Sequence, residues 1–187
     1  MEQLKMIIFE RGGENCKLPR GFFFENYTES SENVGRWAAI IDSDTPFSGT
    51  PEAFFDSVIR KRPGLVPERD LFFITDSSGR AVATSAAVTN PDGTGYVHMF
   101  WSVPEARGKG LGKPLLTETL DRLASRGSFP ATLTTDDFRL PAIKTYLRFG
   151  FVPMISPEPE NDYENRWRAI FEKLGVDPGT VKTLYTK

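Results

Sequence analysis

The segment of residues 96–116, YVHMFWSVPEARGKGLGKPLL, constrains the fold more than any other part of the chain. Its first half, up to Val103, is rich in aromatic and β-branched residues and is too short for anything but a buried strand. Pro104 ends that strand, and three glycines then lead into a helix with leucines on its apolar side. We therefore expect a strand, a glycine-rich turn and a helix in direct succession.

The entry to this helix has the properties of a phosphate site. Backbone N–H groups in a first helical turn lack partners, and the helix N-terminus carries about half a positive charge. A bare, glycine-rich entry therefore suits a phosphate group. Arg107, Lys109 and Lys113 add positive charge to the same turn. A tight turn that binds no ligand is the alternative explanation of the glycines.

Two common phosphate loops do not match this turn. A Walker A loop needs one more residue between its glycines and a hydroxyl residue where Pro114 stands. The dinucleotide fingerprint needs glycine in place of Lys113, and an acidic residue at the end of a second strand. The pattern that does match is R-x-x-G-x-G, formed by Arg107, Gly110 and Gly112.

A second motif follows a predicted strand at residues 131–135. The sequence DDFRLPAIKTYLRFGF predicts a helix that is capped by Asp136 or Asp137, has Pro141 in its first turn and ends at Gly150. This helix carries the pattern A-x-x-x-Y-x-x-x-G-F at Ala142, Tyr146, Gly150 and Phe151.

Together, the two motifs resemble the signatures of the GCN5-related N-acetyltransferase (GNAT) superfamily, which binds acetyl coenzyme A (acetyl-CoA). The likeness is clearest in residues 71–154. Residues 17–41, which contain L-P-x-G-F and Trp37, and the strand VHMFW look similar to the mycothiol-synthase-like branch. The resemblance implies an α/β (α+β) class with the acyl-CoA N-acyltransferase fold, in which a central mixed, mostly antiparallel sheet carries helices on both faces.

The resemblance also implies which residues bind acetyl-CoA. The pantetheine arm should enter a gap between the strand ending at Val103 and the strand at residues 131–135. Arg139 departs from the family, in which asparagine is frequent there, and can reach a coenzyme phosphate or a substrate carboxylate. The residues expected to bind the coenzyme are Trp101, Ser102, Val103, Arg107, Gly108, Lys109, Gly110, Leu111, Gly112, Lys113, Arg139 and Tyr146.

Two side chains are candidates for catalysis. The resemblance implies that Tyr146 lies near the coenzyme sulfur and protonates the leaving thiolate, and a core aromatic residue is the alternative. The resemblance also implies that a backbone N–H near a bulge of this strand, in the region of residues 100–103, stabilises the oxyanion. His98 is the only histidine and a candidate base, which by strand alternation shares a face with Tyr96, Phe100 and Ser102. A structural role for His98 is the alternative, and Glu25, Glu29 and Glu32 are alternative bases.

The length of 187 residues predicts one domain, residues 1–187, with a core at 71–155. Residues 1–70 should form the acceptor side, and residues 156–187 a helical extension that docks on the core or contacts a partner. We expect an edge strand at 4–9, a strand at 22–27, and a hairpin of 71–76 with 80–89. Helices should start at Ser30 or Ser31 and at Thr50. A last helix, capped by Asn161 and Glu164, should carry an apolar stripe of Tyr163, Trp167, Ile170, Phe171 and Leu174.

Composition restricts partners and location. The net charge of −2 argues against a broad basic surface for nucleic acid. No segment approaches the roughly 20 apolar residues of a membrane span, and the apolar start is too short for a signal peptide. The single cysteine, Cys16, forms no internal disulfide, and no metal-binding cluster is visible. We therefore expect a cytoplasmic protein without a metal and without nucleic-acid or membrane partners; a homodimer remains open.

The resemblance implies an N-acetyltransferase that transfers an acetyl group from acetyl-CoA to a primary amine of a small molecule or peptide, by direct attack. The alternative is a non-catalytic acyl-CoA-binding sensor or assembly module, and a longer acyl chain is a further alternative. Glu25, Glu29 and Glu32 weakly favour a cationic acceptor.

Overall fold

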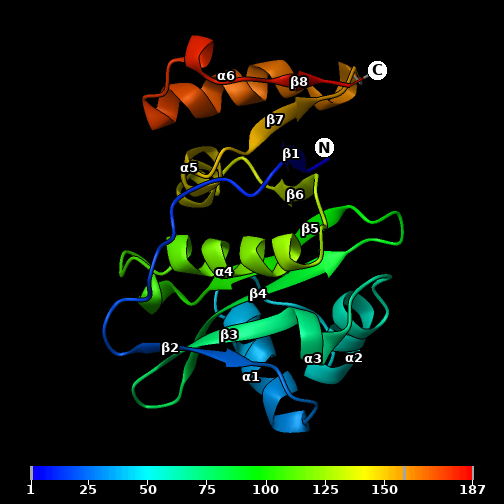
Figure 1. Cartoon of the computed structure of the whole chain (residues 1–187), viewed down its shortest axis with the longest axis vertical. Coiled ribbons are helices and arrows are strands. Elements are labelled where there is room, and N and C mark those ends of the chain that lie inside the picture. Colours follow the sequence, from blue (N-terminus) through cyan, green and yellow to red (C-terminus); the bar gives the residue numbers. More distant parts are fainter. Residues whose placement is uncertain (1, 158, 187) are drawn as a thin grey trace.

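The computed structural model describes residues 2–157 and 159–186. One eight-stranded sheet runs through the molecule in the order β2-β3-β4-β5-β6-β1-β7-β8, from the lower part of Figure 1 to its top. Neighbouring strands are antiparallel except for β5 with β6 and β7 with β8. The strands are β1 (Leu4–Ile8), β2 (Phe22–Asn26), β3 (Leu71–Asp76), β4 (Ala81–Thr89), β5 (Gly95–Ser102), β6 (Ala131–Thr135), β7 (Val152–Ile155) and β8 (Leu184–Tyr185).

Helices cover both faces of this mixed sheet, as predicted. The longer ones are α1 (Ser31–Asp42), α4 (Gly112–Ser125), α5 (Leu140–Arg148) and α6 (Tyr163–Leu174). The shorter ones are α2 (Pro51–Phe55), which continues as a π-helical segment (Asp56–Arg60), α3 (Pro67–Asp70), and 3-10 turns at Pro104–Ala106, Pro159–Asn161 and Pro178–Thr180. Both α1 and α4 pack against β4, from opposite sides. This packing explains why β4 is buried over nearly its whole length.

The core consists of two hydrophobic clusters. The first cluster joins α1 and α2 to strands β3 and β4 and includes Trp37, Phe55 and Phe73. The second cluster joins α4, α5 and α6 to strands β1, β6 and β7 and includes Met6 and Trp167. The apolar stripe of α6 is buried in the second cluster. Helix α6 therefore docks on the core of its own chain, the first of the two roles expected for it.

The position of β1 corrects the sequence prediction of an edge strand at residues 4–9. β1 lies inside the sheet between β6 and β7 and is antiparallel to both. Met6, for example, faces Leu133 on one side and Pro153 on the other. The prediction was wrong because Lys5 alone among the five residues of β1 is exposed, and an apolar run of this kind is typical of an interior strand.

Two predicted helix starts are confirmed. The Ser30 hydroxyl accepts a hydrogen bond from the backbone N–H of Asn33 at 3.1 Å, which caps α1. The Thr50 hydroxyl accepts one from Ala53 at 3.2 Å, which caps α2 just before Pro51.

Two predicted caps are wrong, because distant partners take the capping side chains. Asp137 accepts hydrogen bonds from Arg166, so that α5 begins after Arg139 without a side-chain cap. The side chain of Asn161 accepts a hydrogen bond from the backbone N–H of Glu2 at 3.0 Å. Helix α6 starts after Asp162, whose backbone has a left-handed conformation.

Asp136 does not cap α5 either, since it accepts a hydrogen bond from the side chain of Gln3 at 3.1 Å.

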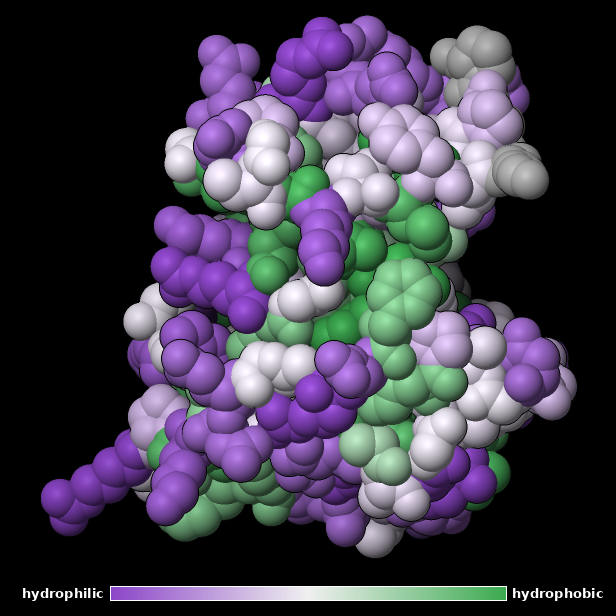
Figure 2. All heavy atoms as spheres, turned by 45° about the horizontal axis from the view of Figure 1, so that its top comes forward, coloured by the Kyte–Doolittle hydropathy of each residue, from purple (hydrophilic) through white to green (hydrophobic). Residues whose placement is uncertain are grey.

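None of the helices within residues 2–157 and 159–186 combines the length and the hydropathy needed to cross a membrane. Figure 2 shows that hydrophilic side chains cover most of one face and surround an apolar area at its centre.

Candidate functional site

The strands β5 and β6 diverge shortly after they meet. They pair only at Gly95 with Ala131 and at Tyr96 with Thr132, although both strands continue well beyond these pairs. The gap that the sequence analysis placed between these strands is therefore present. Backbone groups along the diverging edges have no neighbouring strand with which to pair.

A bulge in β5 lies at the start of the gap. Met99 has a φ of +49°, and the pairing with β4 changes register between Thr84 and Ala86. The bulge reverses the alternation of side chains. Tyr96 and Trp101 pack against the first cluster, whereas Phe100 touches both clusters and its ring lies 5.5 Å from that of Tyr146 in α5. The predicted face shared by His98 and Phe100 is therefore wrong, because the extra residue of the bulge separates them.

The glycine-rich loop has the backbone shape that its sequence requires. Gly108 and Gly110 have φ angles of +74° and +79°, which side chains other than glycine rarely adopt. The region around both glycines is open, since a Cβ at Gly110 would meet only Pro19, at 3.8 Å. Helix α4 follows at Gly112 without a side-chain cap, and its first N–H groups stay available to a ligand.

A cavity of about 680 Å³ lies between this loop, the end of β5 and the start of α5. Its volume falls in the range of small-molecule sites. The predicted coenzyme residues that line it are Trp101, Ser102, Arg107, Gly108, Gly110, Leu111, Gly112, Lys113 and Arg139. Val103, Lys109 and Tyr146 do not line it, and Asp44, Phe138 and Thr145 are among the lining residues that the sequence analysis missed.

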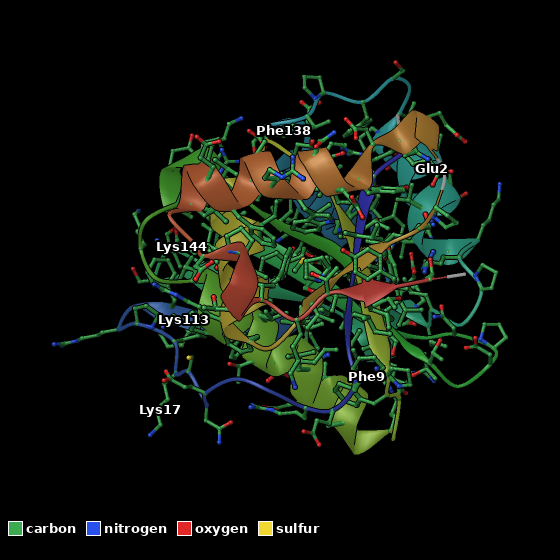
Figure 3. The ribbon with its side chains drawn as sticks, turned by 90° about the horizontal axis from the view of Figure 1, so that it is seen from above. Glu2, Phe9, Lys17, Lys113, Phe138 and Lys144 are labelled. Atoms are coloured by element: carbon green, nitrogen blue, oxygen red, sulfur yellow. The ribbon has the colours of Figure 1, made fainter. Side chains whose placement is uncertain are left out.

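Charged groups surround the mouth of the cavity. Nη2 of Arg107 lies 2.7 Å from Oδ2 of Asp44, in the segment that follows α1. In Figure 3, Lys17, Lys113 and Lys144 lie on the same side of the molecule. Sequence alone offered no signal for Asp44, because only the fold brings it to the loop.

Arg139 stacks on an aromatic ring inside the cavity. The guanidinium carbon lies 3.6 Å from the centre of the Trp101 ring. Its Nε is buried and lies 3.4 Å from a carboxylate oxygen of Asp136, an ionic contact without hydrogen-bond alignment. Burial lowers the pKa of Arg139, but arginine remains charged at neutral pH.

Tyr146 lies one helical turn after Ala142, which lines the cavity. Its side chain is almost fully buried between Phe100 and Phe151. The hydroxyl forms no hydrogen bond with any residue that the structure describes. Burial raises the pKa of Tyr146 further above 10, so the phenol is protonated at neutral pH.

His98 lies on the α1 side of β5, outside the lining of the cavity. Its Nε2 lies 2.8 Å from the carbonyl oxygen of Val58, and its ring centre 5.8 Å from that of Tyr96. Burial lowers the pKa of His98 to about 4, so the ring is neutral at pH 7.

The three glutamates named as alternative bases have other surroundings. Glu25 forms an ion pair with Arg36 at 2.6 Å, and Glu29 pairs with Arg60. Glu32 lines a separate hollow of about 380 Å³. The arginines neutralise the charges of Glu25 and Glu29, which removes most of the basis for expecting a cationic acceptor.

Comparison with known proteins agrees with this geometry. Residues 34–151 match the model of the "Acetyltransferase (GNAT) family". The mycothiol acetyltransferase of Corynebacterium aurimucosum is 29% identical over 150 residues, which cover 70% of this chain and 49% of that protein. The mycothiol acetyltransferase of Arthrobacter sp. (strain FB24) is 33% identical over 81 residues, 41% of this chain and 25% of that protein. The chain thus spans at most about half the length of these curated relatives.

Solved structures show the same fold. A GCN5-related N-acetyltransferase from Sphaerobacter thermophilus has a TM-score of 0.65 and 21% identity, over 80% of this chain and 47% of the other. The ribosomal-protein-S18-alanine N-acetyltransferase from Escherichia coli has a TM-score of 0.54 and 18% identity, over 69% of this chain and 76% of the other. At these identities the likeness concerns the fold alone.

Proposed function

Because the chain belongs to the acetyltransferase (GNAT) family, we propose that it transfers an acetyl group from acetyl-CoA to a primary amine of a small molecule or peptide, in a ternary complex. The proposal rests on the cavity between the glycine-rich loop, the end of β5 and the start of α5. This cavity borders the segment of β5 that has diverged from β6, so a phosphate site and unpaired strand edge lie close together.

The loop and the gap fit the two halves of acetyl-CoA. The free N–H groups at the start of α4 and the side chains of Arg107 and Lys113 suit a pyrophosphate. The unpaired edges of β5 and β6 suit the amide groups of a pantetheine arm. Acetyl-CoA would supply the acetyl group in activated form, as a thioester.

Tyr146 is the proposed general acid. When the amine nitrogen bonds to the acetyl carbon and the C–S bond breaks, the phenol gives its proton to the leaving sulfur. The amine loses a proton in the same reaction, which restores the phenol through solvent. Support comes from the protonated state of Tyr146 and from its contact with Phe100 beside the bulge.

A backbone N–H beside the bulge is the proposed donor to the oxyanion. The bulge at Met99 turns the main chain where β5 leaves β6, directly before the predicted donor region of residues 100–103. A donor fixed in the main chain stabilises developing charge without reorganisation.

His98 is the proposed base. The neutral ring can accept a proton through Nδ1, because Nε2 faces the carbonyl of Val58. A pKa of about 4 makes it a weak base, so its contribution should be moderate. We expect His98→Gln to lower kcat by about tenfold; an unchanged kcat would assign deprotonation to solvent.

The first test of the proposed function is thermal unfolding with and without acetyl-CoA. A ligand at 100 times its Kd stabilises the folded state by about 2.7 kcal/mol, which should raise Tm by about 7 °C. Thiol release in the presence of an amine panel then tests turnover. A shift without thiol release would favour the alternative, a non-catalytic acyl-CoA-binding module; no shift at millimolar acetyl-CoA would exclude both functions.

A further inference from the structure

Two arginines differ from the other half-buried arginines of the chain. Arg11, Arg36, Arg122, Arg126 and Arg166 each donate at least three hydrogen bonds. The side chains of Arg62 and Arg139 donate none to residues 2–157 and 159–186, and the Nε atoms of both are buried. A guanidinium group has five N–H donors, and a buried donor without an acceptor destabilises the fold.

Both arginines stack on aromatic side chains of β5. The guanidinium carbon of Arg62 lies 4.4 Å from the ring centre of Tyr96, and that of Arg139 lies 3.6 Å from the ring centre of Trp101. Tyr96 and Trp101 both pack against the first cluster, and His98 lies between them in the strand. The α1 face of β5, formed by these three residues, therefore carries a guanidinium group at each end.

Stacking fixes the plane of a guanidinium group and leaves the N–H groups on its edge available. Those edges match two oxygen atoms of a planar anion, so a carboxylate can accept two parallel hydrogen bonds. A ring contact holds the group in place but satisfies none of its donors. Both guanidinium groups therefore keep hydrogen-bonding capacity for a carboxylate, and Arg139 does so although its Nε lies 3.4 Å from an oxygen of Asp136.

The location of these groups favours the acceptor over the coenzyme as their ligand. The glycine-rich loop, Arg107 and Lys113 already provide a phosphate site. Arg62 lies outside the cavity, near the end of β5 that is remote from that loop. Arg139 lies within the cavity, on the α1 side of β5 through its contact with Trp101.

We propose that the acceptor is an amine that carries a carboxylate, such as an amino acid or a short peptide, and that Arg139 binds this carboxylate while Arg62 binds a second anionic group. Since β5 rises about 3.3 Å per residue, a small acceptor reaches only Arg139, and a peptide reaches both arginines. This substrate class rests on the proposed acetyl transfer to an amine.

Matched acceptors test the role of Arg139. Glycine, β-alanine and 4-aminobutyrate are each compared with the corresponding carboxamide, and kcat/KM is measured by thiol release. We expect the wild type to prefer at least one carboxylate by about 10- to 100-fold, and Arg139→Leu to abolish that preference without changing KM for acetyl-CoA. Equal rates for all pairs in the wild type would overturn the proposal. A raised KM for acetyl-CoA with the preference intact would assign Arg139 to the coenzyme.

The tripeptides Gly-Gly-Glu and Gly-Gly-Gln test Arg62, because they differ by one carboxylate. We expect the wild type to prefer Gly-Gly-Glu over Gly-Gly-Gln by about tenfold in kcat/KM, and Arg62→Leu to remove this preference. The preference of Arg62→Leu for carboxylate over carboxamide acceptors, which depends on Arg139, should remain. An unchanged preference would overturn the role of Arg62. Arg148→Leu is the matched control, since Arg148 is an exposed arginine at the end of α5, the helix that begins directly after Arg139. Thermal unfolding of each variant detects loss of the fold.

A binding measurement separates this inference from the proposed function. N-acetylglycine, the product expected from glycine, is titrated into the wild type and Arg139→Leu in the presence of coenzyme A. We expect binding at least tenfold weaker in the variant. If no amine supports thiol release but this difference is found, the carboxylate site stands and acetyl transfer fails. If thiol release occurs and both proteins bind N-acetylglycine equally, acetyl transfer stands and the carboxylate site fails.

Discussion

The glycine-rich loop follows the last residues of β5, whereas the α1 face extends along that strand from Tyr96 to Trp101, and the two regions use different chemical groups. The loop presents main-chain groups, and its key residues lie within six consecutive positions, from Arg107 to Gly112. The α1 face presents side chains that come from three separate parts of the chain, near Arg62, Tyr96 and Arg139. A main-chain site can therefore be recognised in the sequence, whereas a side-chain site is assembled only by folding.

The largest expected effect concerns Tyr146, whose ring lies 5.5 Å from that of Phe100 beside the bulge of β5. Tyr146→Phe should lower kcat by about 100-fold, because the leaving thiolate loses its acid. Acetyl-CoA affinity should stay within about twofold, since the ring and its contacts remain. Stopped-flow thiol release and equilibrium binding check both values, with Tyr185→Phe as an exposed control. A kcat within twofold of wild type would show that another group protonates the sulfur.

The second prediction concerns the pH dependence of stability, which His98 on the α1 face should control and the loop should not. Because the folded state lowers the pKa of His98 to about 4, its neutral form stabilises the protein fully above pH 6.5. As pH falls towards 4, the unfolded chain takes up a proton that the folded chain excludes, and stability is lost. We expect this loss to reach about 2 kcal/mol at pH 4.5, measured by urea unfolding. His98→Gln should remove that part of the pH dependence; an identical dependence in the variant would refute it.

The third prediction damages the loop and spares the α1 face. Gly110→Val should raise the Kd of acetyl-CoA by about tenfold, because a residue other than glycine at a φ of +79° costs roughly 1–2 kcal/mol or moves the loop. Acceptor KM should not change. Gly93→Val is the control, since Gly93 has a φ of +86° in the turn at the other end of β5. Equal acetyl-CoA affinity in both variants would mean that the loop does not bind the coenzyme.

The smallest expected effect lies at the ion pair between Arg107 of the loop and Asp44, in the segment that follows α1. Asp44→Asn should lower the Kd of acetyl-CoA by about two- to threefold, because Arg107 is then free to interact with phosphate. The gain should disappear in 0.5 M salt, since partly exposed charges are screened. Calorimetric titration at two salt concentrations checks it. A weaker affinity in Asp44→Asn would mean that Asp44 positions Arg107 for the coenzyme.

The elements that could be predicted from sequence depend on neighbouring residues. The strand at residues 131–135 and the starts of α1 and α2 are where local patterns place them, because Ser30 and Thr50 bond to N–H groups three residues away. The failures involve distant residues. Arg166 takes Asp137 away from α5, and two strands that lie more than 120 positions later enclose β1.

The candidate site follows the same division. The loop was predicted from its glycines, whose φ angles only glycine adopts readily. The bulge was expected in residues 100–103, but its effect on His98 and Phe100 depends on an extra residue at Met99 that strand alternation does not reveal. Asp44 and the stacking of Arg62 on Tyr96 have no local pattern at all, since each contact joins separate elements.

The place of β1 in the sheet sets an order of assembly during synthesis. Leu4 pairs with Thr135, so β1 must wait for a partner made 131 residues later. Strands β2 to β5 pair with neighbours in the sequence and can form a sheet with α1 in the meantime. The second cluster closes only when β7 arrives. Until then, the apolar residues of β1 lack the strands that bury them, so the incomplete chain exposes an aggregation-prone segment that the finished fold conceals.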